Sequence, residues 1–122
     1  HQKANFKSSF SLKFMKFIVC TINKRVYDNL LELKEDYSTA FNEMFDHLTN
    51  QPYESIPRKY FKLVQYRAWE YKLPAFHRIY CKIYLADREK RVVIYHAGCH
   101  PNEGVPQPPG DESIEWTHVY FL

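Results

Sequence analysis

Two strand-like runs in the second half of the chain carry side chains that can bind phosphate or exchange protons. Within the segment from Pro74 to Pro101 these side chains are His77, Arg78, Tyr80, His96 and His100. A planar guanidinium is well suited to a two-pronged contact with phosphate, and histidine is the side chain that exchanges protons near neutral pH. These polar side chains lie in runs that are otherwise mostly apolar. Either they have no special role in the sheet, or the sheet serves to present them to a ligand.

Positive charge is concentrated around this segment. Residues 56–100 contain ten Lys and Arg and three acids, a local net charge of +7, whereas residues 101–122 contain four acids and no Lys or Arg. A basic block with many aromatic residues is typical of a surface that binds a polyanion, because cations neutralise phosphates while rings stack on bases. A solvated face without a ligand is the alternative.

Alternation along the run Phe76–Leu85 predicts two different faces. One is mostly apolar and consists of His77, Ile79, Cys81, Ile83 and Leu85; the other is aromatic and basic and consists of Phe76, Arg78, Tyr80, Lys82 and Tyr84. His77 and, in the next run, His96 fall mainly on the core face, where a hydrogen-bonded structural histidine is the commoner role. A β-bulge would reverse that assignment. Tyr80 and Tyr84 are either base-stacking platforms or half-buried sheet residues.

A zinc site competes for some of the same residues. His96, Cys99 and His100, with Cys81 on the neighbouring run, are ligand types that zinc prefers. Their spacing matches no standard zinc motif, and adjacent ligands are difficult to direct at one tetrahedral ion. We therefore expect neither a metal nor a cofactor.

The elements that must position these residues follow from hydrophobic periodicity. Residues 15–22 read as a buried strand, and Asn23 is a plausible helix cap. Apolar residues then recur every three or four positions from Val26 to Leu48, which predicts helix, with a break near residues 35–38 that gives a helical hairpin. Three strands follow at 67–73, 76–85 and 91–97, with a polar turn at 86–90. The predicted fold class is α+β: an N-terminal strand, a two-helix hairpin and a three-stranded antiparallel meander, with the helices over one face.

The chain of 122 residues is long enough for one small domain. We expect residues 1–14 to be a basic leader that is disordered or foreign to the domain, residues 15–101 to form the domain, and residues 102–122 to be a Pro-rich acidic tail. The tail either folds back over the basic surface, pairs with a partner chain or is disordered. Without a run of about 20 apolar residues, and with three cysteines that suggest no disulfide framework, we expect a cytoplasmic protein that does not enter the membrane. The leader leaves an organellar transit peptide as an alternative.

Four stretches together resemble the RelE/ParE superfamily of bacterial toxin–antitoxin pairs. They are MKFIVCTINKRVYDNLLEL, FDHLTNQPYESIPRKYFKL, WEYKLPAFHRIYCKIY and RVVIYHAGCHP, and they span about residues 15–101. The resemblance concerns a pattern more than invariant residues. It implies a RelE-like fold, a growth-inhibiting mRNA endoribonuclease (mRNA interferase) that acts on free or ribosome-bound mRNA, and a cognate antitoxin protein as partner. ParE-type inhibitors of a protein target are the non-nuclease branch of the same superfamily.

The resemblance also implies roles for individual residues. Arg78 matches a strand arginine that contacts the scissile phosphate, Lys72 matches a basic cleft residue, and His100 falls where the family has an Arg or His. The base would be Glu70 or His77, and no metal is needed. Further RNA contacts would come from other basic and aromatic residues of this block, namely Lys59, Lys62, Arg67, Tyr80 and Lys82. The segment after His100 lacks a tyrosine that is common in the family, and a non-catalytic binding module is therefore the alternative.

Overall fold

The structure is a computed structural model that describes residues 17–51, 53–86 and 89–122. The expected leader at 1–14 and the tip of the predicted turn, residues 87–88, lie outside the described residues. The elements are β1 (Ile18–Thr21), α2 (Lys24–Asp36), α3 (Ser38–Asn50), β2 (Phe61–Leu63), β3 (Trp69–Leu73), β4 (His77–Ala86), β5 (Glu89–Cys99) and β6 (Tyr120–Phe121). Short 3-10 turns η1 to η4 lie at Tyr53–Ser55, Gln65–Arg67, Asp111–Ser113 and Trp116–His118.

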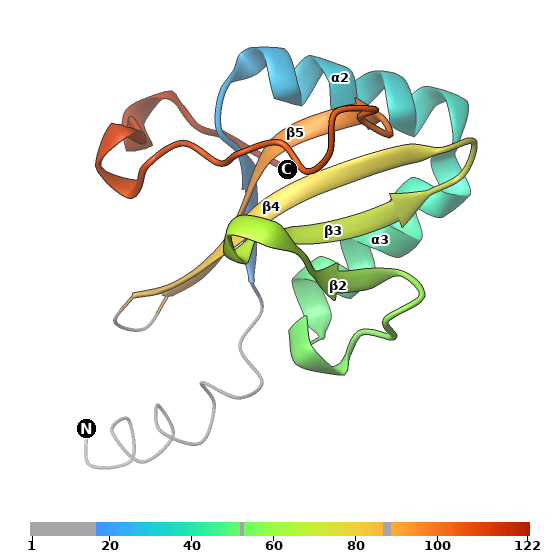
Figure 1. Ribbon diagram of the computed structural model, residues 1–122, viewed down its shortest axis with the longest axis horizontal. Coiled ribbons are helices and arrows are strands. Elements are labelled where there is room, and N and C mark those ends of the chain that lie inside the picture. The colour runs from blue at the N-terminus through green and yellow to red at the C-terminus, as the bar shows by residue number, and fades with distance from the viewer. Residues whose placement is uncertain (1–16, 52, 87–88) are drawn as a thin grey trace.

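The strands form one mixed sheet in the order β2-β3-β4-β5-β1-β6, and both helices lie on one face of it (Figure 1). β1 runs parallel to β5, while the other neighbouring strands are antiparallel. The predicted α+β class and the two helices over one face are confirmed. The predicted strand count is wrong, because β2 and β6 join the sheet at its two edges. Their three and two residues are too short to show an alternating pattern.

The helical hairpin forms where the apolar stripe predicted it. The Asn23 side chain caps α2 by accepting a hydrogen bond from the Val26 amide at 3.0 Å. The helix ends at Asp36, and the residue that caps it, Tyr37, has a non-helical backbone; both lie inside the predicted break. The residues that the helices bury against the sheet are Val26, Leu30, Leu33, Phe41, Met44 and Leu48. None of the helices in the described ranges is long and apolar enough to cross a membrane.

The core lies between the helices and one face of the sheet. Strand residues that alternate toward the helices are buried, among them Val19, Tyr71, Ile79 and Ile94. The opposite face, here called the helix-free face, carries the side chains that alternate with them: Lys62, Glu70, Lys72, Arg78, Tyr80, Lys82, Tyr84 and Arg91. The aromatic and basic face predicted for residues 76–85 is therefore directed away from the helices.

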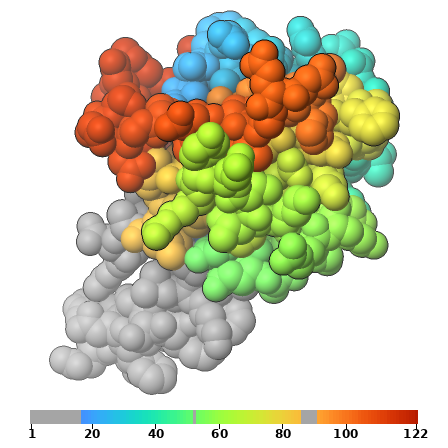
Figure 2. Space-filling view, in the orientation of Figure 1, coloured from blue at the N-terminus to red at the C-terminus, as the bar shows by residue number. Residues whose placement is uncertain are grey.

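The C-terminal tail crosses part of the helix-free face, as the orange and red ridge in Figure 2 shows. The Tyr95 hydroxyl donates to the Pro106 carbonyl at 2.6 Å, and the Tyr84 hydroxyl donates to Asp111 Oδ1 at 2.9 Å. The Trp116 ring packs against the Tyr84 ring edge-on at 5.6 Å, and the guanidinium of Arg91 lies 4.9 Å from its centroid. The tail then ends in β6, which pairs with β1. It covers the part of the face around Tyr84 and Arg91.

Candidate functional site

Lys72 and Arg78 lie directly opposite each other on β3 and β4. Each alternates with buried neighbours that face the helices, so both side chains are on the helix-free face. Directly opposed side chains on adjacent strands have Cβ atoms about 5 Å apart, and like charges in such a pair destabilise a sheet. Within the described ranges, no carboxylate lies within 4.0 Å of either cation. The pair is an uncompensated concentration of positive charge that an anion would neutralise.

The Arg78 guanidinium has an unused donor. Its Nη1 donates to the His77 carbonyl at 2.8 Å, but its Nε is buried and has no hydrogen-bond partner within the described part of the chain. A buried donor without a partner costs about 1–3 kcal/mol. On the other side of Arg78 lies Gly98, and a Cβ atom built there would meet nothing within 4 Å. The surface beside Arg78 is therefore open.

The buried carboxylate of Glu70 lies on β3, two residues before Lys72. The Tyr80 hydroxyl donates to Glu70 Oε2 at 2.8 Å, and Lys62 Nζ lies 3.9 Å from Glu70 Oε1. Only 6% of Glu70 and 1% of Tyr80 are exposed. Burial raises the pKa of the Tyr80 hydroxyl, the hydrogen bond and charge of Glu70 add to the rise, and the charge of Arg78 opposes it. Tyr80 is therefore a neutral donor that holds one oxygen of the carboxylate.

His96 lies on the helix-free face, which corrects the core position expected from alternation. β5 contains a bulge: Tyr80 pairs with His96, whereas the next residue, Cys81, pairs with Ile94, so Tyr95 is an extra residue. The bulge reverses the alternation and brings the His96 ring to 5.7 Å from the Tyr80 ring. Burial, with the charge of Arg25, lowers the pKa of His96. Its imidazole is therefore neutral at neutral pH.

Phe76 precedes β4 and His100 follows β5, and both lie at the end of these two strands that is nearer to Arg78. The His100 amide donates to the Phe76 carbonyl at 2.6 Å, which continues the pairing of β4 with β5 by one residue. Phe76 belongs to a tight turn in which Ala75 and Phe76 have φ values of 56° and 59°. These values are costly for residues other than glycine, and such strain gathers at functional sites. The turn leaves the Phe76 side chain 78% exposed.

His77 lies on the other face of the sheet. It pairs with Leu73 and Cys99, its Nδ1 is 2.9 Å from the Pro74 carbonyl, and its ring packs 5.3 Å from the Tyr37 ring. It therefore does not share a face with Lys72 and Arg78, and we leave it out of the candidate site. The competing zinc ligands are also separated, because Cys81 is buried toward the helices and His96 faces away from them. Within the described residues, no three His, Cys, Asp or Glu side chains are placed to hold a metal ion.

The other predicted RNA-contact residues are spread over the same side of the molecule. Lys62 and Tyr80 contact Glu70, as described above. Arg67 and Lys82 line a groove of about 450 Å³ at the opposite end of the face, together with Trp69 and Tyr84. Lys59 is exposed, with its ammonium 5.0 Å from the Tyr60 ring centroid.

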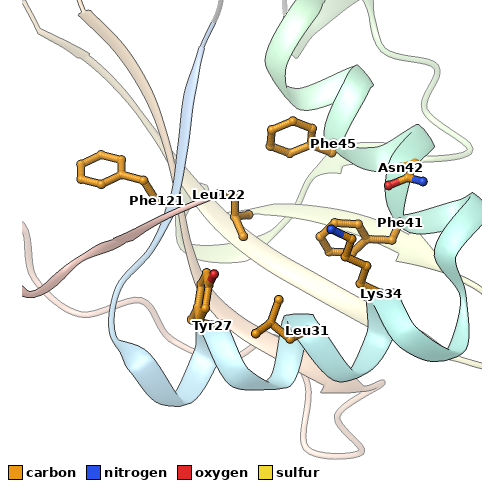
Figure 3. Close-up of a pocket in the computed structure, with 8 residues that line it drawn as sticks. All are labelled: Tyr27, Leu31, Lys34, Phe41, Asn42, Phe45, Phe121 and Leu122. Atoms are coloured by element: carbon orange, nitrogen blue, oxygen red, sulfur yellow. The ribbon is translucent and has the colours of Figure 1, made fainter.

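A second groove is mostly apolar and lies on the side of the helices. Its volume is about 350 Å³, and it is lined by Tyr27, Leu31, Lys34, Phe41, Asn42, Phe45, Phe121 and Leu122 (Figure 3). Figure 3 shows that these residues come from α2, α3 and the C-terminal strand. The groove contains none of the residues of the candidate site.

Comparisons with protein-family models, with curated proteins and with solved structures find no match for this chain. The RelE-like fold therefore stays a prediction from the sequence pattern. A function has to be argued from the residues that the sheet brings together, namely Glu70, Lys72, Arg78, Tyr80, His96 and His100.

Proposed function

We propose that this protein is a metal-independent endoribonuclease that cleaves mRNA, acting as the toxin of a toxin–antitoxin pair. The observation that carries the proposal is the uncompensated Lys72–Arg78 pair, which lies beside the buried carboxylate of Glu70. Two cations that lie opposite each other on adjacent strands suit the two non-bridging oxygens of a phosphodiester. The exposed ring of Phe76, two residues before Arg78, can stack on a base.

The chemistry needs a base, an acid and cations around one phosphorus atom. The Glu70 carboxylate takes the proton from the ribose 2′-OH, and the 2′-oxygen then bonds to phosphorus while the bond from phosphorus to the 5′-oxygen breaks. His100 gives a proton to the departing 5′-oxygen, and Lys72 and Arg78 stabilise the charge on the phosphorane. The products are a 2′,3′-cyclic phosphate and a 5′-hydroxyl end.

The arrangement of the strands supports these roles. Glu70 on β3 is level with Tyr80, and His100 after β5 is level with Phe76, so the two residues lie on opposite sides of Arg78 both across the sheet and along β4. A phosphate bound at Arg78 would therefore have the base on one side and the acid on the other. Tyr80 bonds only Oε2 of Glu70, so Oε1, which has Lys62 at 3.9 Å, is the oxygen that would accept the proton.

The second candidate is a binding module on the same surface that does not cleave RNA. It is either an RNA-binding relative without activity or an inhibitor of a protein target, like the ParE branch. The observation that favours it is the burial of Glu70, which is only 6% exposed and is already bonded to Tyr80. The phosphate-binding pair would be retained in either case.

The two candidates differ in the products formed from RNA. Purified protein should cut a single-stranded RNA in the presence of EDTA and leave cyclic phosphate ends, and its induced expression should arrest growth. Glu70→Gln should abolish cutting but keep RNA binding, whereas Arg78→Ala should lose both. Lys34→Ala, which removes a charge on the helix side, is the matched control. RNA that is bound but stays intact, both free and on ribosomes, would favour the binding module instead.

A further inference from the structure

One stretch of β4 has a partner strand on only one side. β3 pairs with β4 from His77 to Cys81, whereas β4 continues to Ala86. Among the described residues no strand borders Lys82–Leu85 on the side of β3, and we call this stretch the β4 edge segment. Figure 1 shows the β4–β5 hairpin projecting beyond the start of β3. Pairing with β5 holds the segment extended, as the pairs Lys82–Val93 and Leu85–Lys90 show.

The backbone of the β4 edge segment offers unused hydrogen-bonding groups. In an antiparallel ladder, alternate residues exchange both backbone hydrogen bonds with the partner, and the residues between them direct their N–H and C=O to the other side. Half of the segment therefore presents donors and acceptors to the open side. An extended edge of this kind is a template on which another strand can add.

The side chains beside the β4 edge segment form the groove of about 450 Å³ that contains Arg67. Ile83 and Leu85 line it on β4, while Tyr53, Leu63 and Trp69 line it on the other side. Leu63 and Leu85 are 55% and 60% exposed, although both are large and apolar. A strand laid along the edge would cover them.

The charges in this groove favour one kind of partner strand. Lys82 and Arg67 are its two cations and Asp111, which accepts a hydrogen bond from Tyr84, is its one acid, so the groove has a net charge of +1. Arg67 lies in the tight turn between β2 and β3, in which Tyr66 and Arg67 have φ values of 62° and 56°.

We propose that the β4 edge segment is the docking site for an extended segment of a partner protein, in which apolar and acidic side chains alternate. The added strand bonds to the backbone of Lys82–Leu85. Its apolar side chains pack beside Ile83, Leu85 and Trp69 on the helix side, and its acidic side chains meet Lys82 and Arg67 on the other. The β4 edge segment has four residues and is about 13 Å long, so about four residues of the partner strand pair with it. The site does not depend on the nuclease proposal, because it uses none of the residues at the Lys72–Arg78 pair.

The test uses a labelled synthetic peptide of about eight residues in which valine and glutamate alternate. Fluorescence anisotropy should detect binding to the full chain, and Lys82→Glu or Leu85→Glu should weaken it by about tenfold or more. Leu31→Glu, which alters an exposed leucine on α2, is the matched control and should bind as the unaltered protein does. In NMR spectra the amides of residues 82–85 should shift and exchange more slowly with solvent when the peptide is bound.

Backbone pairing is tested separately from charge. The same peptide with alternate amides N-methylated keeps its side chains but cannot add as a strand, and it should fail to bind; equal binding would overturn the proposal. Two other occupants are excluded in the same experiment. An RNA oligonucleotide that shifts the amides of 82–85 while the peptide does not would assign the groove to RNA. Self-association that Leu85→Glu abolishes would assign it to a second copy of the chain.

Discussion

The Tyr80 hydroxyl donates to Oε2 of Glu70 at 2.8 Å, in a place where both side chains are almost completely buried. A buried carboxylate needs hydrogen-bond partners. Tyr80 is the closer partner of Glu70, because Lys62 lies 3.9 Å from the other oxygen. The bond joins two adjacent strands and sets the carboxylate next to the Lys72–Arg78 pair. It therefore contributes both to stability and to the geometry of the candidate site.

Tyr80→Phe should lower the free energy of unfolding by about 1–3 kcal/mol, because it leaves a buried carboxylate oxygen without its donor. Urea denaturation measures the loss. The matched control is Tyr84→Phe, which also removes a hydroxyl bonded to a carboxylate, but one on the exposed residue Asp111, and it should cost less. Equal losses in the two variants would show that the burial of Glu70 does not matter.

Lys72→Gln should stabilise the protein by about 0.2–1 kcal/mol in a buffer of low salt without phosphate, because it removes a like-charge pair across two strands. Adding phosphate should raise the melting temperature of the unaltered protein more than that of Lys72→Gln or Arg78→Gln. Thermal denaturation with and without phosphate measures both effects. Lys34→Gln should keep the full response to phosphate, and a response that survives in Arg78→Gln would contradict an anion site there.

His96 should make the protein less stable in acid. Its pKa is lowered in the folded state, so the unfolded chain binds the proton more readily. The resulting penalty is absent above the unfolded pKa of about 6.5 and grows as pH falls below it, until the folded pKa is passed. His96→Gln should flatten the pH dependence of the free energy of unfolding between neutral pH and about pH 5. His118→Gln is the control on an exposed histidine.

The three cysteines should react with iodoacetamide at very different rates in the folded protein. Cys99 is exposed and should react first. Burial raises the pKa of Cys20 to about 11, with the charge of Arg91 opposing the rise, and burial alone raises the pKa of Cys81. Because the thiolate is the reactive form, Cys20 and Cys81 should be labelled only after denaturation. Mass spectrometry of peptides from native and denatured samples reports this directly, and fast labelling of Cys81 in the native protein would refute its burial.

Periodicity was sufficient for the helices and the long strands. The stripe from Val26 to Leu48 predicted the helices, and the end of α2 at Asp36 falls within the predicted break. Alternation also placed Arg78 and Lys82 on one face, because a long strand imposes its period on every residue. β2 and β6 were not predicted, because strands of three and two residues show no periodicity. They join the sheet because each finds an edge strand to pair with.

The sequence by itself determined the α+β class, the helix-free face with its cations, and the place of Arg78 on that face, because these depend on local period and composition. The tertiary structure decided which of these groups meet. Strand register brought Lys72 opposite Arg78 and Tyr80 opposite Glu70, although each pair is several residues apart in the chain. A single bulge moved His96 from the core face to the helix-free face. Register and bulges are set by the packing of distant residues, and one residue of shift reverses the face of every side chain beyond it.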